Sequence, residues 1–213
     1  MVTTRPARVL FFRPSLDQGG ADRVTITVLR QLDRTRIAPS IALAKATGAL
    51  LGEVPADVPV HDLHAPRLAA SLPALVRVVR ATRPDVIFST SSGCNAIAIA
   101  ARALARVPAR VVLSERNAVV RPSHHPLRRA LEVPLKRATY ARAALVTAVS
   151  DGVADDLRRV LGLPHDAVRV IGNPVVTADF DARAAEPVTH PWFDAAAQAV
   201  APVVLAVGRM VPA

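Results

Sequence analysis

The sequence predicts an α/β protein whose parallel sheet is covered by helices on both faces. Short runs rich in β-branched residues alternate along the chain with longer segments of helical periodicity. The predicted strands are apolar throughout instead of alternating apolar with polar residues, which is typical of parallel strands buried on two sides. With 213 residues, 51% of them hydrophobic, the chain is long enough to close one sizeable core.

In chain order, the β-branched and aromatic runs predict strands at 8–12, 40–44, 58–62, 85–89, 110–114, 145–149 and 168–171. The 3.6-residue periodicity predicts helices at 21–32, 71–82, 94–106, 126–142 and 151–161. Pro84 and Pro108 restrict the residues before them, so the second and third helices should end there. Ser150 has the position and the hydroxyl of an N-cap for the last helix.

We expect three segments along the chain. Residues 1–172 carry the strand and helix pattern and should form one domain. Residues 173–200 are alanine-rich, acidic and interrupted by proline, which is the composition of a linker. Residues 201–213 contain an apolar strand followed by Gly208 and Arg209, so we expect the first strand of a second domain that the sequence does not complete.

The charge balance favours an anionic partner. The chain has 27 Lys and Arg against 17 Asp and Glu, a net charge of +10, which suits nucleotide phosphates, an anionic membrane surface or nucleic acid. A compositional preference for arginine explains the excess equally well. Tyr140, Trp192 and five phenylalanines offer few stacking platforms, so nucleic acid is not favoured.

Cysteine usage and apolar run lengths predict a cytoplasmic protein. Cys94 is the one cysteine, so no intrachain disulfide forms and a reducing compartment is indicated. The apolar run near the N-terminus is too short for a signal peptide, and no run approaches the ~20 residues that span a bilayer. Any membrane role would be peripheral. No Cys/His grouping has metal-ligand spacing, so neither a metal nor another cofactor is expected.

Gly19 and Gly20 precede the first predicted helix. Two glycines at a helix N-terminus let the backbone approach an anion, towards which the helix dipole also points. The three spaced glycines of a dinucleotide fingerprint are missing, so NAD binding is not predicted. A purely structural role for the pair is the alternative.

Hydroxyl and amide groups follow the strand at 85–89. Ser92 and Asn95 lie at a strand-to-helix turn, where they suit the hydroxyl groups of a sugar acceptor, although the same residue types also cap helices. Cys94 has no histidine near it in sequence. We therefore interpret it as a buried, inert thiol.

Charged and polar residues also follow the strand at 110–114. Glu115, Arg116 and Asn117 place an acid, a cation and an amide on one loop at the carboxyl end of a strand, where open parallel sheets bind ligands. This is the strongest candidate for chemistry. A local Glu115–Arg116 ion pair is the alternative.

The helix at 126–142 has an amphipathic pattern. Its apolar stripe consists of Leu127, Leu131, Leu135 and Ala138, and its cations are Arg128, Arg129, Lys136 and Arg142 on the other side. Such a helix can rest on anionic lipid. The alternative is the solvated outer surface of the sheet's helical layer.

Five motifs in sequence order resemble the family 4 glycosyltransferases, and the match extends over nearly the whole chain. They are Gly19-Gly20, the Ser-Glu-Arg-Asn run at 114–117, Ala-Val-Ser at 148–150, Ile-Gly-Asn-Pro-Val at 171–175 and Val-Gly-Arg at 207–209. The resemblance implies the GT-B architecture, in which two Rossmann-like, doubly wound domains face a cleft. This chain would supply the amino-terminal, acceptor-binding domain.

Members of this family transfer a sugar from a nucleotide-sugar with retention of configuration and generally without a metal. The resemblance therefore implies a retaining, hexosyltransferase-like enzyme in which Gly19, Gly20 and Arg209 contact the donor. Glu115, Arg116 and Asn117 would form the catalytic loop. Many relatives carry a His-Asp pair there, and this chain has no histidine at that place, which leaves the sugar contact to Glu115 or Asn117.

The donor-binding lysine and paired glutamates of the family would lie beyond Ala213, so we expect the isolated chain to bind nucleotide-sugar poorly and not to turn over. The expected partners are a nucleotide-sugar donor, a glycan or lipid-linked acceptor and an anionic membrane surface, with a role in cell-envelope polysaccharide or glycolipid synthesis. Two alternatives stay open: a non-catalytic module that binds an anionic glycan or nucleic acid, and a sugar-nucleotide epimerase of the same fold.

Overall fold

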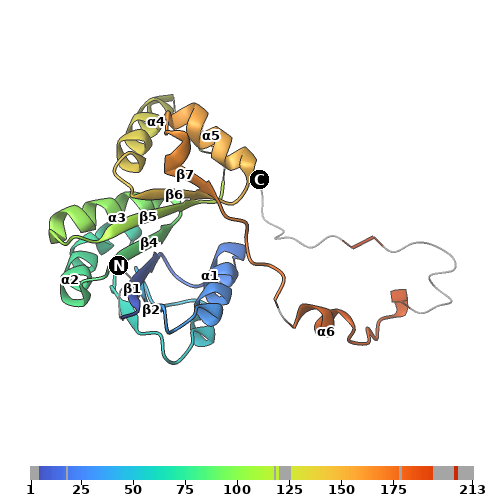
Figure 1. The fold of residues 1–213 in the computed structure, drawn as a ribbon. Coiled ribbons are helices and arrows are strands. Elements are labelled where there is room, and N and C mark those ends of the chain that lie inside the picture. The colour runs from blue at the N-terminus through green and yellow to red at the C-terminus, as the bar shows by residue number, and fades with distance from the viewer. Residues whose placement is uncertain are drawn as a thin grey trace. The chain divides into compact units, whose positions relative to one another are not determined.

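A seven-stranded sheet in the order β3-β2-β1-β4-β5-β6-β7 forms the centre of the protein, and every neighbouring pair of strands is parallel (Figure 1). The structure is a computed structural model that describes residues 5–17, 19–117, 119, 126–177, 179–193 and 204–205, without the side chains of residues 126–131 and 193. The strands are β1 (Ala7–Arg13), β2 (Ile37–Leu43), β3 (Val60–Asp62), β4 (Val86–Thr90), β5 (Arg110–Glu115), β6 (Leu145–Ala148) and β7 (Val168–Val170).

Each predicted strand is present, and each of the five predicted helices is found within two residues of its expected limits. The helices are α1 (Gly20–Gln31), α2 (Leu72–Thr82), α3 (Ser92–Ala105), α4 (Pro126–Tyr140) and α5 (Asp151–Leu161). Short elements that the sequence did not predict are α6 (Phe180–Ala184) and the 3-10 turns η1 (Leu51–Glu53), η2 (Leu68–Ser71), η3 (His165–Ala167) and η4 (Pro191–Phe193). The predicted N-cap is confirmed, because Ser150 Oγ accepts the Val153 N–H.

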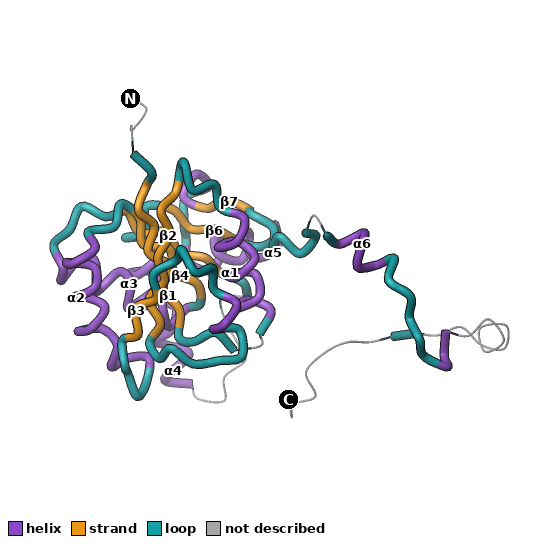
Figure 2. The backbone as a smooth tube through the Cα atoms, turned by 90° about the horizontal axis from the view of Figure 1, so that it is seen from below, coloured by secondary structure: helices purple, strands orange, loops and turns teal. Residues whose placement is uncertain are grey.

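Helices cover both faces of the sheet, as the fold class requires. α1 lies on one side of β1, and α2 and α3 lie on the other (Figure 1). α3 contacts α2 and α4, and α4 contacts α5, so these four helices form one layer. Figure 2 shows the strands enclosed between the helices. The predicted doubly wound α/β class is confirmed.

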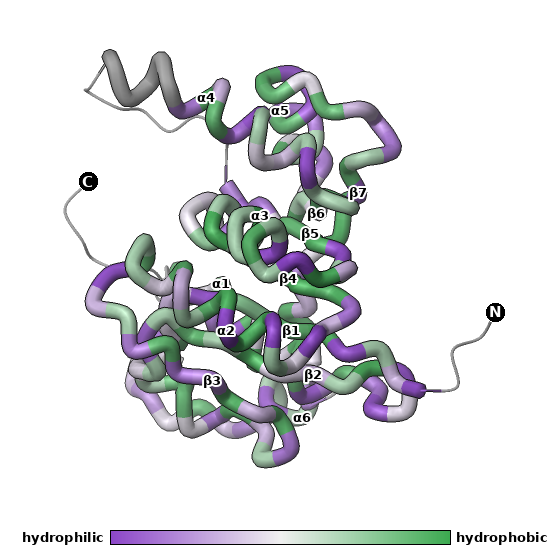
Figure 3. Tube along the Cα trace, turned by 90° about the vertical axis from the view of Figure 1, so that its left-hand side faces the viewer, coloured by the Kyte–Doolittle hydropathy of each residue, from purple (hydrophilic) through white to green (hydrophobic). Residues whose placement is uncertain are grey.

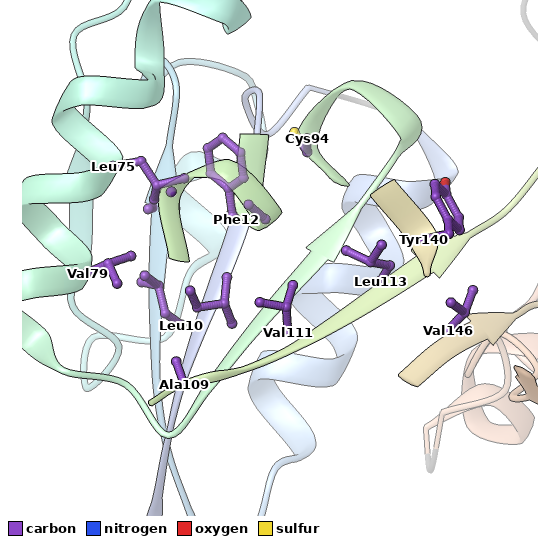
Figure 4. Close-up of a cluster of buried hydrophobic side chains, with 14 of the residues drawn as sticks. Leu10, Phe12, Leu75, Val79, Cys94, Ala109, Val111, Leu113, Tyr140 and Val146 are labelled. Carbon is purple, nitrogen blue, oxygen red and sulfur yellow. The ribbon is translucent and has the colours of Figure 1, made fainter. Parts of the chain in front are cut away.

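Consecutive side chains of β1 enter two separate cores. Leu10 and Phe12 pack on the α2 side with Leu75 of α2 and Leu113 of β5 (Figure 4), whereas Phe11 packs on the α1 side. The second core also contains, among others, Ile26 and Leu29 of α1 and Ile41 and Leu43 of β2. Each such side chain contributes about 1.5–3 kcal/mol when fully buried. Burial on both faces explains the continuous apolar runs, visible in green along β4 and β5 in Figure 3.

Two helices end on arginines in the left-handed conformation. Arg83 follows α2 with φ 43° and ψ 60°, and Arg106 follows α3 with φ 56° and ψ 38°. This conformation costs an L-residue roughly 1–2 kcal/mol and is usually occupied by glycine. α5 ends in the usual way, on Gly162 with φ 63°. Pro84 and Pro108 follow the two arginines closely, at the predicted helix ends.

The two-faced pattern predicted for α4 is wrong in the half whose side chains are described. Leu135 is 65% exposed, and Lys136 lies on the inner side, where it pairs with Glu132 and donates a hydrogen bond to the Val119 carbonyl. The inner face is instead formed by Val133, Thr139 and Tyr140, among others. On this inner face the Tyr140 hydroxyl donates a hydrogen bond to the buried Glu115 carboxylate. The side chains of Leu127, Arg128, Arg129 and Leu131 lie outside the described residues.

The chain divides into two compact units, Met1–Val175 and Val176–Ala213. The described side chains of the second unit are largely exposed, including Trp192 at 60%. The predicted strand at 201–213 lies outside the described residues except for Val204 and Leu205, and Arg209 lies outside them as well. The predicted segments 1–172, 173–200 and 201–213 stay a prediction.

Candidate functional site

The strongest candidate site lies at the carboxyl ends of β1, β4 and β5. The chain leaves β1 through α1 on one face of the sheet, and it leaves β4 through α3 on the other. β1 and β4 are neighbours, so their carboxyl ends form the point at which the connections diverge. Ligands of open parallel sheets bind at such a point.

Arg13, the last residue of β1, connects three elements at this edge. Its guanidinium forms a buried ion pair with Asp22 of α1 and donates a hydrogen bond to Thr90 Oγ1 of β4. The other carboxylate oxygen of Asp22 accepts the Gly19 N–H at 3.2 Å. Arg13 Nε is buried without a hydrogen-bond partner among the described residues. These contacts hold the first turn of α1 against the ends of β1 and β4.

The two predicted glycines differ in their surroundings. A Cβ atom at Gly19 would lie 3.0 Å from Asp22 Oδ2, whereas a Cβ at Gly20 would meet no atom within 4 Å. Gly19 therefore permits the close contact with Asp22, while Gly20 leaves open space beside the start of α1. Whether either glycine contacts a donor stays a prediction.

A third glycine, which the sequence analysis did not single out, shapes the same edge. Gly48 has a φ of 117°, and a Cβ there would lie 2.1 Å from the Leu16 carbonyl oxygen. The loops after β1 and β2 run together at this point: the Leu16 N–H donates to the Thr47 carbonyl, and the Leu50 N–H donates to Leu16. Leu16 is fully buried. The loop after β2 therefore fixes the main chain at Leu16, three residues before Gly19.

Glu115, Ser92 and Asn95 belong to one buried polar network. Glu115 is only 3% exposed, and its carboxylate accepts hydrogen bonds from Tyr140 Oη, from Ser92 Oγ at 3.0 Å and from its neighbour's backbone N–H. The amide group of Asn95, itself fully buried, lies 2.9 Å from Tyr140 Oη. Burial and then the negative charge of Glu115 raise the pKa of Tyr140 above its ordinary value. The predicted catalytic acid and the predicted acceptor contacts thus meet, but Glu115 and Asn95 are closed off from solvent.

The turn from β4 into α3 is strained at this site. Ser91 has a φ of 92°, a value that a non-glycine residue rarely adopts. It occupies the N-cap position of α3 without a side-chain capping bond. The Ser92 hydroxyl reaches Glu115, so it has a role other than capping. Strain of this kind is concentrated at functional sites.

Arg116 points away from Glu115, so the alternative of a local ion pair between them does not describe their contacts. Its guanidinium donates to Asn173 Oδ1 at 2.9 Å, and its Nε is buried without a partner in the described part of the chain. Burial and then the charge of Arg13 lower the pKa of Arg116, while Asp22 acts in the opposite sense. Arg116 is therefore influenced by the charges of both Arg13 and Asp22.

A cavity of about 90 Å³ lies beside Arg116. Its walls come from α1, from β1, β4, β5 and β6, and from the segment after β7. They include Val28, Phe88, Thr147, Ile171 and Asn173. Asn117 follows Arg116 in the same loop and is exposed. Among the described residues, no group of three or more His, Cys, Asp or Glu side chains is arranged to hold a metal ion.

The sequence model of Glycosyltransferase Family 4 matches residues 18–179, which include the whole of this edge from the start of α1 onward. The chain belongs to glycosyltransferase family 4. No curated protein matches this family 4 chain significantly. In the part of the chain that is described, no helix has the length and apolar character needed to cross a membrane.

Solved structures show the same fold as this family 4 chain. HepE from Anabaena, solved in complex with UDP, is 20% identical with a TM-score of 0.59, covering 78% of this chain and 44% of its own. Sucrose-phosphate synthase from Thermosynechococcus elongatus is 13% identical with a TM-score of 0.60, covering 78% and 48%. UDP-N-acetylglucosamine 2-epimerase from Rickettsia bellii is 11% identical with a TM-score of 0.54, covering 79% and 45%.

The chain therefore spans less than half the length of these structures and has the fold of one half of a GT-B glycosyltransferase. The predicted family and fold are confirmed. The roles assigned to Gly19, Gly20, Ser92, Asn95 and the 115–117 loop stay predictions.

Proposed function

We propose that this chain is the acceptor-binding half of a retaining, hexosyltransferase-like enzyme that moves a sugar from a nucleotide-sugar to a glycan or a lipid-linked acceptor. The observation that carries the proposal is the positive edge formed by Arg13 and Arg116 beside the start of α1. Arg116 lies within residues 18–179, the stretch that the family model matches, and Arg13 lies just before it. The unpaired Nε of Arg116 adjoins a cavity. Guanidinium groups and a helix N-terminus favour a diphosphate, whose negative charge grows as the sugar departs.

The contacts at this edge suggest different roles for the three loop residues. Glu115 acts as a positioning residue, because its buried carboxylate accepts the Arg116 backbone N–H and fixes the loop. Arg116 faces the donor diphosphate. Asn117 is exposed and contacts the transferred sugar. Ser92, half-buried at the strained turn, is the acceptor-side hydroxyl, while Asn95 supports it from the core.

The wider setting follows from charge and family. A net charge of +10 suits a peripheral position at the cytoplasmic face of a membrane, where lipid-linked acceptors for cell-envelope polysaccharide or glycolipid synthesis are presented. The proposal needs no metal, because the guanidinium groups supply the positive charge. Most donor contacts would be made by a second, donor-binding half.

The test is a titration of the isotopically labelled chain with nucleotide-sugars and oligosaccharides, followed by amide NMR. We expect oligosaccharides to shift amides around Ser92 and Asn117, and nucleotide-sugars to bind weakly with shifts around Gly19. Arg116→Gln should abolish the nucleotide-sugar shifts, whereas Arg67→Gln, at an exposed position, should not.

Three results would contradict the proposal. Amide shifts confined to other parts of the chain would show that the ligands do not bind at this edge. An epimerised sugar-nucleotide formed without acceptor would favour the epimerase reaction that one structural relative performs. A low-micromolar dissociation constant for any nucleotide-sugar would contradict the expectation that the donor binds mainly elsewhere.

A further inference from the structure

A second and larger cavity, of about 950 Å³, lies at the amino edge of the sheet. β1 has seven residues, so the two edges are separated by roughly 20 Å. The cavity is lined by Arg5, Arg8, Arg80, Arg83, Pro84, Asp85, Ala105, Arg106, Val107, Pro108 and Arg110. Six arginines therefore surround one carboxylate.

Asp85 gives this cavity a fixed frame. Its N–H donates to the Arg8 carbonyl at 2.9 Å, and its own carbonyl accepts the Arg110 N–H at 2.9 Å, so it joins the beginnings of β1 and β5. Its carboxylate accepts the Arg8 N–H at 2.8 Å and two bonds from the Arg5 guanidinium, each 2.8 Å long. These donors lower the pKa of Asp85 well below its ordinary range. The Asp85 carboxylate is thus already engaged by hydrogen bonds from Arg5 and Arg8.

The six guanidinium groups differ in their partners. Arg5 and Arg8 lie against Asp85, the latter at 3.7 Å, and Arg80 donates to the Leu104 carbonyl. The side chains of Arg83, Arg106 and Arg110 make no ion pair or hydrogen bond with any described part of the chain. Three positive charges therefore face the cavity without a counter-charge.

Helix electrostatics explain only part of this arrangement. Arg83 and Arg106 follow the carboxyl ends of α2 and α3, where the helix dipole favours a cation. Arg110 is the first residue of a strand and gains nothing from a helix. In addition, both helix-end arginines have the left-handed backbone that glycine or asparagine adopts most readily. Arginine therefore occupies two positions at which glycine or asparagine would adopt the backbone conformation at lower cost.

Part of the cavity lining is apolar. Pro84 is buried, Ala105 is 6% exposed and Val107 is half-buried. Arg83, Arg106 and Arg110 are exposed, so a ligand can reach them from solvent. The volume is in the range of small-molecule sites.

We propose that this amino-edge cavity binds an anion that carries phosphate groups. The planar guanidinium fork matches phosphate oxygens in pairs, and three unpaired forks from two helix ends and one strand converge here. The same chemistry is offered by a free oligophosphate and by the phosphodiester headgroups of anionic lipids. Binding at this edge leaves the carboxyl edge free for sugar transfer.

The test compares the 213-residue chain with a variant that combines Arg83→Asn, Arg106→Asn and Arg110→Gln. Asparagine tolerates the left-handed conformation, so the first two substitutions should not destabilise the fold. The control variant removes the same charge from exposed arginines elsewhere, through Arg67→Gln, Arg169→Gln and Arg183→Gln. A further variant, Arg116→Gln, lacks the guanidinium that is proposed to face a diphosphate at the carboxyl edge, so any binding that this variant loses is assigned to that edge and not to this cavity.

Two probes distinguish the sources of phosphate. Inorganic triphosphate is titrated by calorimetry, and vesicles of phosphatidylglycerol with phosphatidylcholine are sedimented with the protein, against phosphatidylcholine alone. We expect binding of one probe or both to weaken at least about tenfold in the triple variant and to persist in the control. Loss of triphosphate binding identifies a free oligophosphate, and loss of vesicle binding alone identifies a lipid headgroup. Equal binding of both probes to wild type and triple variant, or no binding of either, would overturn the proposal.

Discussion

The hydroxyl group of Tyr140, at the end of α4, donates a hydrogen bond to the carboxylate of Glu115, at the end of β5. Tyr140 is 2% exposed, and its ring packs beside Leu113 and Val146 in the core (Figure 4). The phenol of Tyr140 therefore connects the first residue of the candidate loop at 115–117 to the core, beside the weaker-placed Ser92 hydroxyl.

Replacing this phenol tests the attachment. Tyr140→Phe keeps the ring but leaves the buried Glu115 carboxylate with one donor fewer, which should lower the free energy of unfolding by about 1.5–3 kcal/mol. Urea denaturation measures this difference. Ser92→Ala removes the other side-chain donor from a half-buried position and should cost less. An equal or larger loss in Ser92→Ala would show that the phenol is not the main anchor.

The buried pair of Arg13 and Asp22 should behave differently from an exposed pair. Arg13→Met or Asp22→Leu alone leaves one buried charge unpaired and should cost roughly 3–5 kcal/mol. The double variant should cost less than the sum by more than about 1 kcal/mol, because no isolated charge remains. The partly exposed pair Arg34–Asp57 is the control, with an expected coupling of at most about 1 kcal/mol. Strict additivity at Arg13 and Asp22 would contradict the prediction.

Asp85 should make stability depend on acid pH. Its folded pKa lies below the ordinary value of 3.8, mainly because of the Arg5 hydrogen bond and then the Arg8 N–H. Its contribution is therefore complete above about pH 4 and is lost as the pH falls through the folded value. Because 34% of the side chain is exposed, we expect Asp85→Asn to cost only about 1 kcal/mol at pH 7.

The wild-type advantage over Asp85→Asn should shrink progressively below about pH 4, as measured by urea unfolding across that range. Asp166→Asn, at an exposed site without an arginine partner among the described contacts, serves as the control. A stability difference that is the same at neutral and at strongly acid pH would rule out this linkage.

Cys94 should be protected from thiol reagents while the protein is folded. The side chain is fully buried, and burial raises its pKa to about 11. The thiolate is the reactive form, so a disulfide reagent at mildly alkaline pH should modify Cys94 only as fast as the protein unfolds. The same reagent in denaturant should react at once. Rapid modification under native conditions, increasing with pH as for a free thiol, would show that the pocket around Cys94 opens locally.

The order of strands and helices could be predicted because it depends on local patterns. Residues 9–12 are apolar on both faces of β1, and the prolines at 84 and 108 lie just after helix ends, so short sequence windows contain the information. The carboxyl-edge rule also located Glu115 and Ser92 correctly at strand ends.

The contacts within the site could not be predicted in the same way. Tyr140 and Glu115 are 25 residues apart in sequence, and Arg116 and Asn173 are 57 apart, so nothing local connects them. The sequence analysis assigned Glu115 to catalysis and Asn95 to acceptor binding, whereas both belong to one buried network in the structure. An arginine that ends an apolar strand was the available signal for Arg13, since a charge there requires a nearby partner.

Gly48 has a consequence for how this edge can change. The loop after β1 takes its path from the loop after β2 through main-chain hydrogen bonds at Leu16, and no side chain larger than hydrogen fits where they cross. The conformations of the two loops therefore depend on each other. An insertion at 44–50 would displace the start of α1 even though every residue from 13 to 22 was unchanged, and a transplant of one loop into a relative would succeed only with the other.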